Sequence, residues 1–290
     1  SSGAEAPSPN CEGPVALQVL GSGGPIADDG RASAGYLIWV DGRARVLVDA
    51  GGGTFLRFAQ SGASFDDLQL VLLTHHHADH TSDLPALLKS ASFGSRREDL
   101  PVAGPSGNER FPPLEEFLRA LLGDEDGAFR YLGGYLQSPG EPFALRLKTV
   151  DVEREEPTVV HDEDGLRVRG MGVRHGIVPA LGYVIEVQGK RIAFTGDQRM
   201  DDPRFEQMIE GADLLVAHHA IPEDAGDAAR ALHATPSRIG QLAAGAEVGR
   251  VVLSHHMGRS LRDREGSEQN IRSQYDGPLQ FAEDLDCFAP

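Results

Sequence analysis

The sequence predicts an α/β fold in which two β-sheets pack face to face and helices cover their outer sides, a four-layer αββα sandwich. Two observations lead to this class. Short β-rich runs bounded by glycine-rich turns alternate with helical segments along the chain. Both halves of the chain show this alternation, without an alignable repeat. With 290 residues and 40% hydrophobic content, the chain can form a sizeable core.

The first half is expected to begin with Val15–Leu20 as a strand, which runs into the glycine-rich turn Gly21–Pro25. Asp41-Gly42 is a strong hairpin signal between two further strands. A triple glycine at 51–53 then ends this region, and Thr54 can cap a short helix. The other strands expected here are Gly35–Val40, Arg45–Asp49 and Leu70–Leu73, and the helices are Thr54–Ala59, Leu84–Leu88 and Leu114–Leu122.

The second half is expected to contain more strands than helices. It follows the glycine- and charge-rich segment 123–140, which we interpret as an excursion over the surface. The expected strands are Arg167–Val173, Tyr183–Val187, Arg191–Thr195, Leu214–Ala217 and Val251–Ser254, and the helices are Pro203–Ile209, Thr235–Ala244 and Glu268–Gln274.

A flexible tail is predicted for residues 1–12, because its first ten residues are rich in Ser, Pro, Ala and Gly, and a single domain for 13–290. The chain starts without methionine, which either a removed signal peptide or trimming would explain. The two cysteines, Cys11 and Cys287, lie near opposite ends of the chain. A disulfide between them and two free thiols are both compatible with the sequence.

The composition limits the classes of partner. The formal net charge is −17, which disfavours a polyanion overall, although a local basic patch could exist. No apolar stretch approaches the roughly 18 residues of a membrane span.

The most informative segment is Thr74–His80, directly after the apolar run Leu70–Leu73. It reads H-x-H-x-D-H, and residues two apart on an extended segment can point the same way. Its four candidate metal ligands are His75, His77, Asp79 and His80. Imidazole and carboxylate are ligands of hydrolytic zinc sites. A surface histidine tract is the alternative, but it would need neither the aspartate nor the preceding strand. The motif therefore predicts two adjacent divalent metal ions.

Three further candidate ligands, His175, Asp197 and His255, each follow a predicted strand. Loops above a rigid sheet are where functional sites are usually built. Each residue alone is typical of a turn or a cap. With the first motif they make seven ligands, five histidines and two aspartates, which is enough for two ions if one carboxylate bridges.

In these motifs and their order, the chain resembles the metallo-β-lactamase superfamily, and within it the tRNase Z-like and phosphodiesterase–arylsulfatase-like branch. The resemblance runs from about Val15 to about Arg259. Besides the metal motifs, it is carried by Gly21–Pro25, Val48–Thr54, Gly104-Pro105, Gly182-Tyr183, Thr195–Asp197 and Ser254-His255.

The resemblance implies how the ligands divide between two ions, and it predicts the metallo-β-lactamase fold. His75, His77 and His175 would hold one ion, Asp79, His80 and His255 the other, and Asp197 would bridge them. Asp49 is similar to the buried aspartate that supports the metal loop in this family. Zinc is the expected metal, with manganese or iron as alternatives.

The candidate catalytic residues are Asp79, His233 and Arg259. His233-Ala234-Thr235-Pro236 resembles the His-Ser-Thr motif of the branch, and Arg259 matches the arginine after its last metal histidine. A helix-start residue without a chemical role is the alternative for His233. The branch carries a glutamate that orients this histidine, and His219 stands in its place. This departure argues against tRNA processing, as does the lack of a basic cluster in 122–150.

These features predict a dinuclear metal-dependent hydrolase that uses a metal-bound hydroxide on small phosphodiester or sulfate-ester substrates. The alternatives are a lactonase or amidohydrolase, including a β-lactamase, on the same site, a tRNA 3′-processing endonuclease, and a binding protein without activity. The expected partner is a small-molecule ester with no long nucleic acid and no membrane span, and a homodimer is left open. The expected location is periplasmic or secreted, with the cytoplasm as the alternative.

Overall fold

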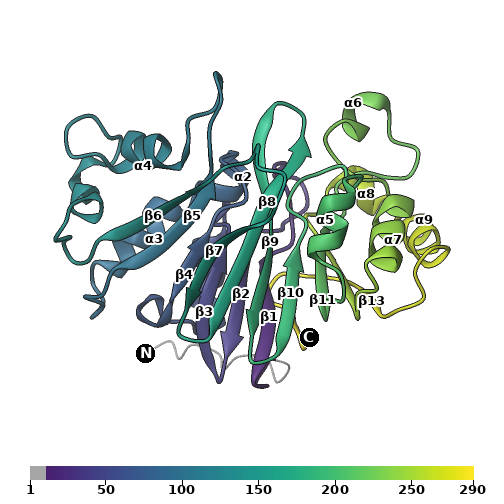
Figure 1. Cartoon of the computed structure of the whole chain (residues 1–290), viewed down its shortest axis with the longest axis horizontal. Coiled ribbons are helices and arrows are strands. Elements are labelled where there is room, and N and C mark those ends of the chain that lie inside the picture. Colours follow the sequence, from purple (N-terminus) through teal and green to yellow (C-terminus); the bar gives the residue numbers. More distant parts are fainter. Residues whose placement is uncertain (1–10) are drawn as a thin grey trace. The chain divides into compact units, whose positions relative to one another are not determined.

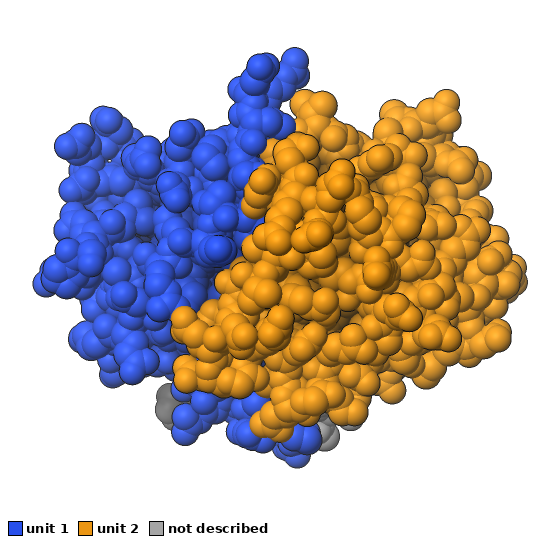
Figure 2. Space-filling view, in the orientation of Figure 1, with its two compact units in different colours: residues 1–21, 32–150, 285–289 blue, residues 22–31, 151–284, 290 orange. Residues whose placement is uncertain are grey.

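The computed structural model describes residues 11–290, which fall into two compact units, each built around a seven-stranded sheet (Figures 1 and 2). Unit 1 contains Ala32–Val150, the segment that ends at Gly21, and Leu285–Ala289. Unit 2 contains Asp151–Asp284 and Ser22–Arg31. Most of the tail expected at 1–12 lies outside the described residues. The single domain expected over 13–290 stays a prediction.

The sheet of unit 1 has the strand order β14-β1-β2-β3-β4-β5-β6. Neighbouring strands from β14 to β3 pair antiparallel, and those from β3 to β6 pair parallel. The strands are β1 (Val15–Gly21), β2 (Gly35–Val40), β3 (Arg43–Val48), β4 (Leu70–Leu72), β5 (Leu100–Pro105), β6 (Leu145–Val150) and β14 (Cys287–Phe288). Every residue of β1 is buried, so the sheet is covered on both faces there.

The helices of unit 1 pack on one face of its sheet. They are α1 (Thr54–Ser61), α2 (Ala78–Thr81), α3 (Leu84–Ala91) and α4 (Leu114–Leu122), with 3₁₀ helices η2 (Phe65–Asp67) and η3 (Arg130–Leu136). In α4 the buried residues Leu114, Leu118 and Leu122 are spaced four apart, which places them on one helix face. This face joins Leu47 and Val71 of the sheet in one apolar core.

The sheet of unit 2 has the order β13-β12-β11-β10-β9-β8-β7, antiparallel from β7 to β10 and parallel from β10 to β13. Its strands are β7 (Thr158–Glu163), β8 (Leu166–His175), β9 (Val178–Val187), β10 (Lys190–Phe194), β11 (Leu214–His218), β12 (Val251–Ser254) and β13 (Leu279–Phe281).

The helices of unit 2 are α5 (Pro203–Met208), α6 (Asp227–Arg230), α7 (Pro236–Gly245), α8 (Gly258–Leu261) and α9 (Arg264–Arg272). Figure 1 shows α7 and α9 side by side, in green and yellow, and they contact each other. Phe205 of α5, Ile239 of α7 and Ile271 of α9 share a core with Leu215 and Leu253 of the sheet. The parallel part of this sheet thus packs against helices through one apolar core.

Most expected elements are present, and the differences have local causes. The strands β5, β6, β7, β13 and β14 were not expected. Strand β5 contains two prolines and a glycine, β6 carries the exposed Arg146 and Lys148, and β7 ends in the exposed Asp162 and Glu163. Strands β13 and β14 are only three and two residues long. Strand β9 begins five residues earlier than expected, since Pro179 and Gly182 are tolerated within it. The segment 123–140 is not purely a surface excursion. Tyr135 of η3 is buried, and its hydroxyl donates to the carbonyl of Leu88.

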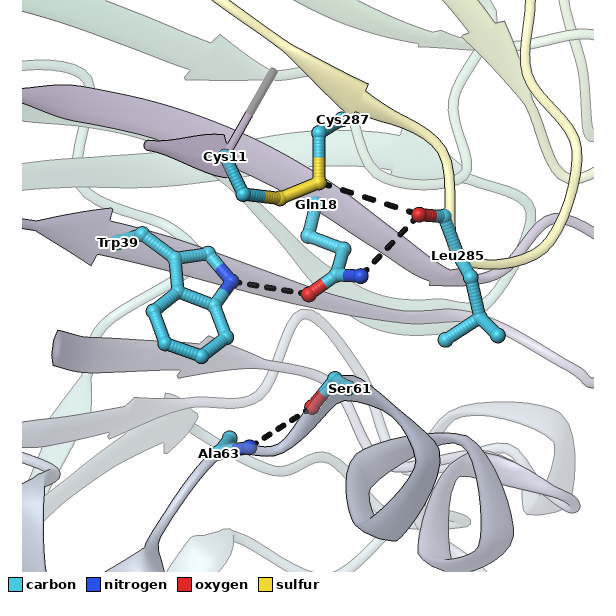
Figure 3. The surroundings of a disulfide bond; sticks show 7 residues. All are labelled: Cys11, Gln18, Trp39, Ser61, Ala63, Leu285 and Cys287. Carbon is cyan, nitrogen blue, oxygen red and sulfur yellow. Dashed lines mark hydrogen bonds between the residues drawn. A yellow bond between two sulfur atoms is a disulfide. The ribbon is translucent and has the colours of Figure 1, made fainter. Parts of the chain in front are cut away.

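A disulfide joins Cys11 to Cys287 within unit 1, with Cα atoms 5.3 Å apart (Figure 3). Cys287 lies in β14, where it pairs with Gln18 of β1. The Gln18 side chain accepts a hydrogen bond from the indole of Trp39 and donates one to the carbonyl of Leu285. The choice that the sequence left open is therefore resolved as a disulfide. Such bonds persist in oxidising compartments, so this one is compatible with export, which stays a prediction.

Replacing both cysteines with serine should lower the free energy of unfolding by about 2–4 kcal/mol. The bond closes a loop of 276 residues and so restricts the unfolded chain. Urea unfolding followed by circular dichroism would measure the loss. Dithiothreitol should destabilise the original protein and leave the double variant unchanged. Two free thiols in denatured, unreduced protein would contradict the assignment.

Candidate metal centre

The candidate ligands lie where strands end, in each unit separately. In unit 1, the segment Thr74–His80 follows β4, and Asp49 follows its parallel neighbour β3. In unit 2, Asp197 follows β10 and His255 follows β12, while His175 is the last residue of β8. Side chains at the carboxyl edge of parallel strands converge above a rigid sheet.

Asp49 organises the metal loop of unit 1 through three hydrogen bonds. It is fully buried, and it accepts from the backbone N–H and the hydroxyl of Thr74, both at 2.8 Å. Its third contact is with Nδ1 of His80 at 2.7 Å. Asp49 has a φ of 58°, a left-handed conformation that is uncommon for a residue other than glycine. These contacts hold both ends of the histidine motif against β3.

Gly51 allows the same loop to lie against the chain that follows β3. A Cβ atom there would sit 2.0 Å from the carbonyl oxygen of Asp79, so no other residue fits. The approach is fixed by two backbone hydrogen bonds, from Ala50 to the carbonyl of His80 and from Asp83 to the carbonyl of Ala50. Gly51 is thus needed for packing and is more than a chain break.

The side chains of the histidine motif alternate as their spacing predicts. His75 Nε2 and His77 Nδ1 lie 3.1 Å apart, so these two rings converge. His76 instead stacks on Phe117, with ring centres 4.2 Å apart, and burial lowers its pKa to about 4. On α2, His80 Nε2 lies 3.2 Å from a carboxylate oxygen of Asp79. Unit 1 therefore presents four convergent donor groups.

In unit 2, three imidazole rings lie around the carboxylate of Asp197. Nε2 of His175 lies 3.4 Å from one of its oxygens, and Nε2 of His255 lies 3.4 Å from the other. Nδ1 of His218 is closer, at 2.6 Å. Gly24 leaves room for one of these rings, because a Cβ there would lie 2.9 Å from the His255 ring.

The orientation of two histidines fits bound cations. Nδ1 of His175 lies 2.9 Å from the carbonyl of Leu232, and since a carbonyl only accepts, Nδ1 carries the proton. In the neutral ring, the lone pair of Nε2 then faces the Asp197 carboxylate. The same arrangement recurs in unit 1, where His80 faces Asp49 through Nδ1 and Asp79 through Nε2. Facing lone pairs repel unless a second proton or a cation lies between them, and metal-binding histidines characteristically donate their other N–H in this way.

Comparison with known families identifies the chain. The family described as "Beta-lactamase superfamily domain" matches residues 44–256. The chain belongs to the metallo-β-lactamase superfamily, in its tRNase Z-like branch. It is a hydrolase of that superfamily, as the sequence predicted.

Similar proteins cover nearly the whole chain. "Ribonuclease Z" of Mycolicibacterium paratuberculosis is 27% identical over 93% of this chain and 96% of its own length. "Ribonuclease Z" of Thermobifida fusca is 29% identical over 93% of this chain and 92% of its own length. The structure of the short form of human tRNase Z superimposes with a TM-score of 0.72 at 19% identity, covering 94% of this chain and 98% of that one. The metallo-β-lactamase fold protein YhfI of Bacillus subtilis superimposes with a TM-score of 0.69 at 19% identity, covering 96% of this chain and 100% of that one. The predicted metallo-β-lactamase fold is thus confirmed.

These relatives correct the prediction about partners. The sequence analysis expected a small-molecule ester and no long nucleic acid, and this expectation is wrong, because the relatives that span the chain are ribonucleases. The expectation rested on the net charge of −17, on His219 in place of the branch's glutamate and on the lack of a basic cluster in 122–150, and none of these describes the surface beside the candidate site. Charges farther apart than about 10 Å are largely screened, so a distant carboxylate does not decide what a site binds. Among residues 11–290, no helix is long and apolar enough to cross a bilayer.

Sequence reasoning did not identify His218 as a residue of the candidate site. It is the last residue of β11, is buried, and lies closest to Asp197. Its ring also stacks on His255, with centres 4.6 Å apart. It therefore fixes the orientation of a candidate ligand, which is the usual role of residues behind a metal site. The signal for it was its place at the end of a buried strand parallel to β10 and β12.

His219 does not act as a substitute for the glutamate that orients the helper histidine in this branch. One of its ring nitrogens lies 2.9 Å from Nδ1 of His256, and the other lies 2.8 Å from the hydroxyl of Ser267. Both nitrogens are therefore engaged away from His233. Burial, together with the smaller effects of Arg264 and Arg31, lowers the pKa of His219 to about 3.

The other candidate catalytic residues lie in unit 2. His233 is buried, and its ring centre is 5.3 Å from that of His175. Burial lowers the pKa of His233 to about 3, while Asp197 opposes this shift. Arg259, at the start of α8, donates to the carbonyl of Ala220 and to the sulfur of Met257. These contacts support the loop after β11, and a catalytic role for Arg259 stays a prediction.

The neutral, buried His219 should make the stability of the protein depend on pH. Its pKa is about 3 when folded and about 6.5 when unfolded. Between these values the unfolded chain binds more protons, so the free energy of unfolding should fall as the pH drops below 6.5. His219→Gln should reduce this slope. Urea unfolding at pH 5, 6, 7 and 8 would measure it, and equal slopes in the two proteins would refute the argument.

Proposed function

We propose that the chain is a dinuclear metal-dependent phosphodiesterase that cleaves RNA. The observation that supports an RNA substrate is the near-complete alignment of the chain with proteins named ribonuclease Z. A neighbour in the same fold is titled a diphosphatase of the PhnP family. Hydrolysis at phosphorus is the chemistry that the ribonuclease and diphosphatase names have in common.

Seven side chains are proposed to hold the two ions, and zinc suits their imidazole and carboxylate donors. The proposed ligands are His75, His77, His175 and Asp197 for one ion, and Asp79, His80, Asp197 and His255 for the other. Asp197 belongs to both groups, so it is the proposed bridge. The proton positions inferred for His80 and His175 leave an unprotonated nitrogen for a metal in each unit.

When bound, two divalent ions would offset the negative charge of the phosphate and lower the pKa of a water molecule. Asp79, which is half-buried at the start of α2, is the candidate to take a proton from the attacking water. The water oxygen bonds to phosphorus, one P–O ester bond breaks, and the leaving oxygen gains a proton. His233, beside His175, is the candidate hydrogen-bond donor to that oxygen.

Metal content tests the ligand set. Protein loaded with zinc and freed of loosely bound metal should contain about two equivalents by elemental analysis. Asp197→Ala should lower this content and abolish RNA cleavage, since it removes a ligand shared by both ions. Asp28→Ala removes an exposed aspartate of unit 2 and should change neither. One ion or none in the unmodified protein would count against the dinuclear proposal.

RNA cleavage tests the substrate and the helper histidine together. Metal-loaded protein should cleave a precursor tRNA on denaturing gels, and His233→Ala should lower kcat by about 10²–10⁴. His161→Ala removes another buried histidine of unit 2 and should keep activity. An unchanged kcat in His233→Ala would remove this residue from the mechanism. Hydrolysis of an aryl phosphodiester without RNA cleavage would keep the chemistry and reject the substrate.

A further inference from the structure

A pocket of about 300 Å³ in unit 2 has a cationic wall. Three arginines line it: Arg199 after β10, Arg230 at the end of α6, and Arg238 in α7. Asp201 is the one acidic residue among its lining residues. The wall therefore has a formal charge of +2, counting His233 as neutral, whereas the whole chain carries −17.

The three guanidinium groups are not equally compensated. Arg199 forms an ion pair with Asp201, at 3.0 Å. Arg238 donates to the carbonyl of Met200 and to the side-chain oxygen of Gln241. Both of these acceptors are neutral, so they fix the arginine without cancelling its charge. Arg230 lies exposed at the rim. Arg230 and Arg238 thus supply the positive charge of the pocket.

His233 connects this pocket to the candidate metal centre. It lines the pocket and is only 9% exposed. Its Nδ1 has no hydrogen-bond partner among the described residues, and a buried polar atom of this kind indicates a missing partner such as a ligand or water. On its other side the ring neighbours those of His175 and His255, with centres 5.3 and 6.1 Å away.

The start of helix α7 does not itself provide the anion site. The N–H and hydroxyl of Ser237, in its first turn, both donate to the carboxylate of Glu223. That end of the helix is therefore already capped by an acid. Recognition of an anion in this pocket depends on the arginine side chains, which suit phosphate through paired N–H donors.

We propose that this pocket binds a phosphate of the RNA strand that flanks the phosphate being cleaved. Arg230 and Arg238 contact its oxygens, and Nδ1 of His233 hydrogen-bonds to the same nucleotide. The proposal rests on the proposed function, because it assigns a second contact on the same substrate. It explains how an acidic chain holds a polyanion: the contact is made by one concentrated cationic patch beside the cleavage site.

The test compares two double variants of the metal-loaded protein. One is Arg230→Gln with Arg238→Gln. The matched control is Arg167→Gln with Arg272→Gln, which removes the same charge from exposed arginines of unit 2 that pair with Asp162 and Glu268. Binding of a fluorescein-labelled single-stranded oligoribonucleotide is measured by anisotropy at several salt concentrations. Cleavage of the same RNA is measured on gels.

The pocket variant should bind the RNA about tenfold more weakly, and its plot of log Kd against log salt should flatten by about 0.7, the value for one lost phosphate contact. The control should bind like the original protein. Equal losses of affinity in both variants, or no loss in the pocket variant, would contradict phosphate binding in the pocket. If the RNA is cleaved but the pocket variant binds it normally, the proposed function stands and the pocket is rejected. If only the pocket variant loses affinity and no RNA is cleaved, the pocket stands and the proposed function is rejected. If the protein neither binds nor cleaves the RNA, both are rejected.

Discussion

The structure depends on buried carboxylates, each of which needs hydrogen-bond donors or cations beside it. A carboxylate that loses water and gains no partner is strongly destabilising. Asp49 is matched by a backbone N–H, a hydroxyl and an imidazole. Asp197 is surrounded by three imidazoles. Each unit thus has one aspartate around which its candidate ligands are arranged, and the loops after the strands follow from this arrangement.

The sheets determine where those carboxylates can lie. Asp49 follows β3 and Asp197 follows β10, each at the point where its sheet changes from antiparallel to parallel pairing. His255 follows β12 and, like Asp49, has a positive φ, of 54°. Strained backbone of this kind persists only where surrounding contacts require it. The apolar cores beneath the strands and the hydrogen bonds above them supply those contacts, so stability and site geometry have the same origin.

The sequence predicted those parts of the fold and site that are encoded locally. Asp41-Gly42 marks a hairpin, and H-x-H-x-D-H marks a metal loop, because neighbours in the chain carry the whole signal. The edge strands β6 and β7 were missed, since their exposed charged residues are typical of loops. The partners of His219 were also missed, because Ser267 is 48 residues away in the chain. Such contacts are set by how strands and helices pack, and a single sequence does not display them.

The same distinction explains the error about nucleic acid. A net charge is a sum over the chain, while recognition of a phosphate depends on groups within a few ångströms of it. Here acidic residues exceed basic ones by 17, yet the lining of one pocket reverses the sign. Two divalent ions at the proposed centre would add four positive charges close by. The acidic balance of the chain as a whole would disfavour non-specific contacts with polyanions. Under the proposed function, a strand that places one phosphate in the pocket and another at the metals would therefore be favoured over other polyanions.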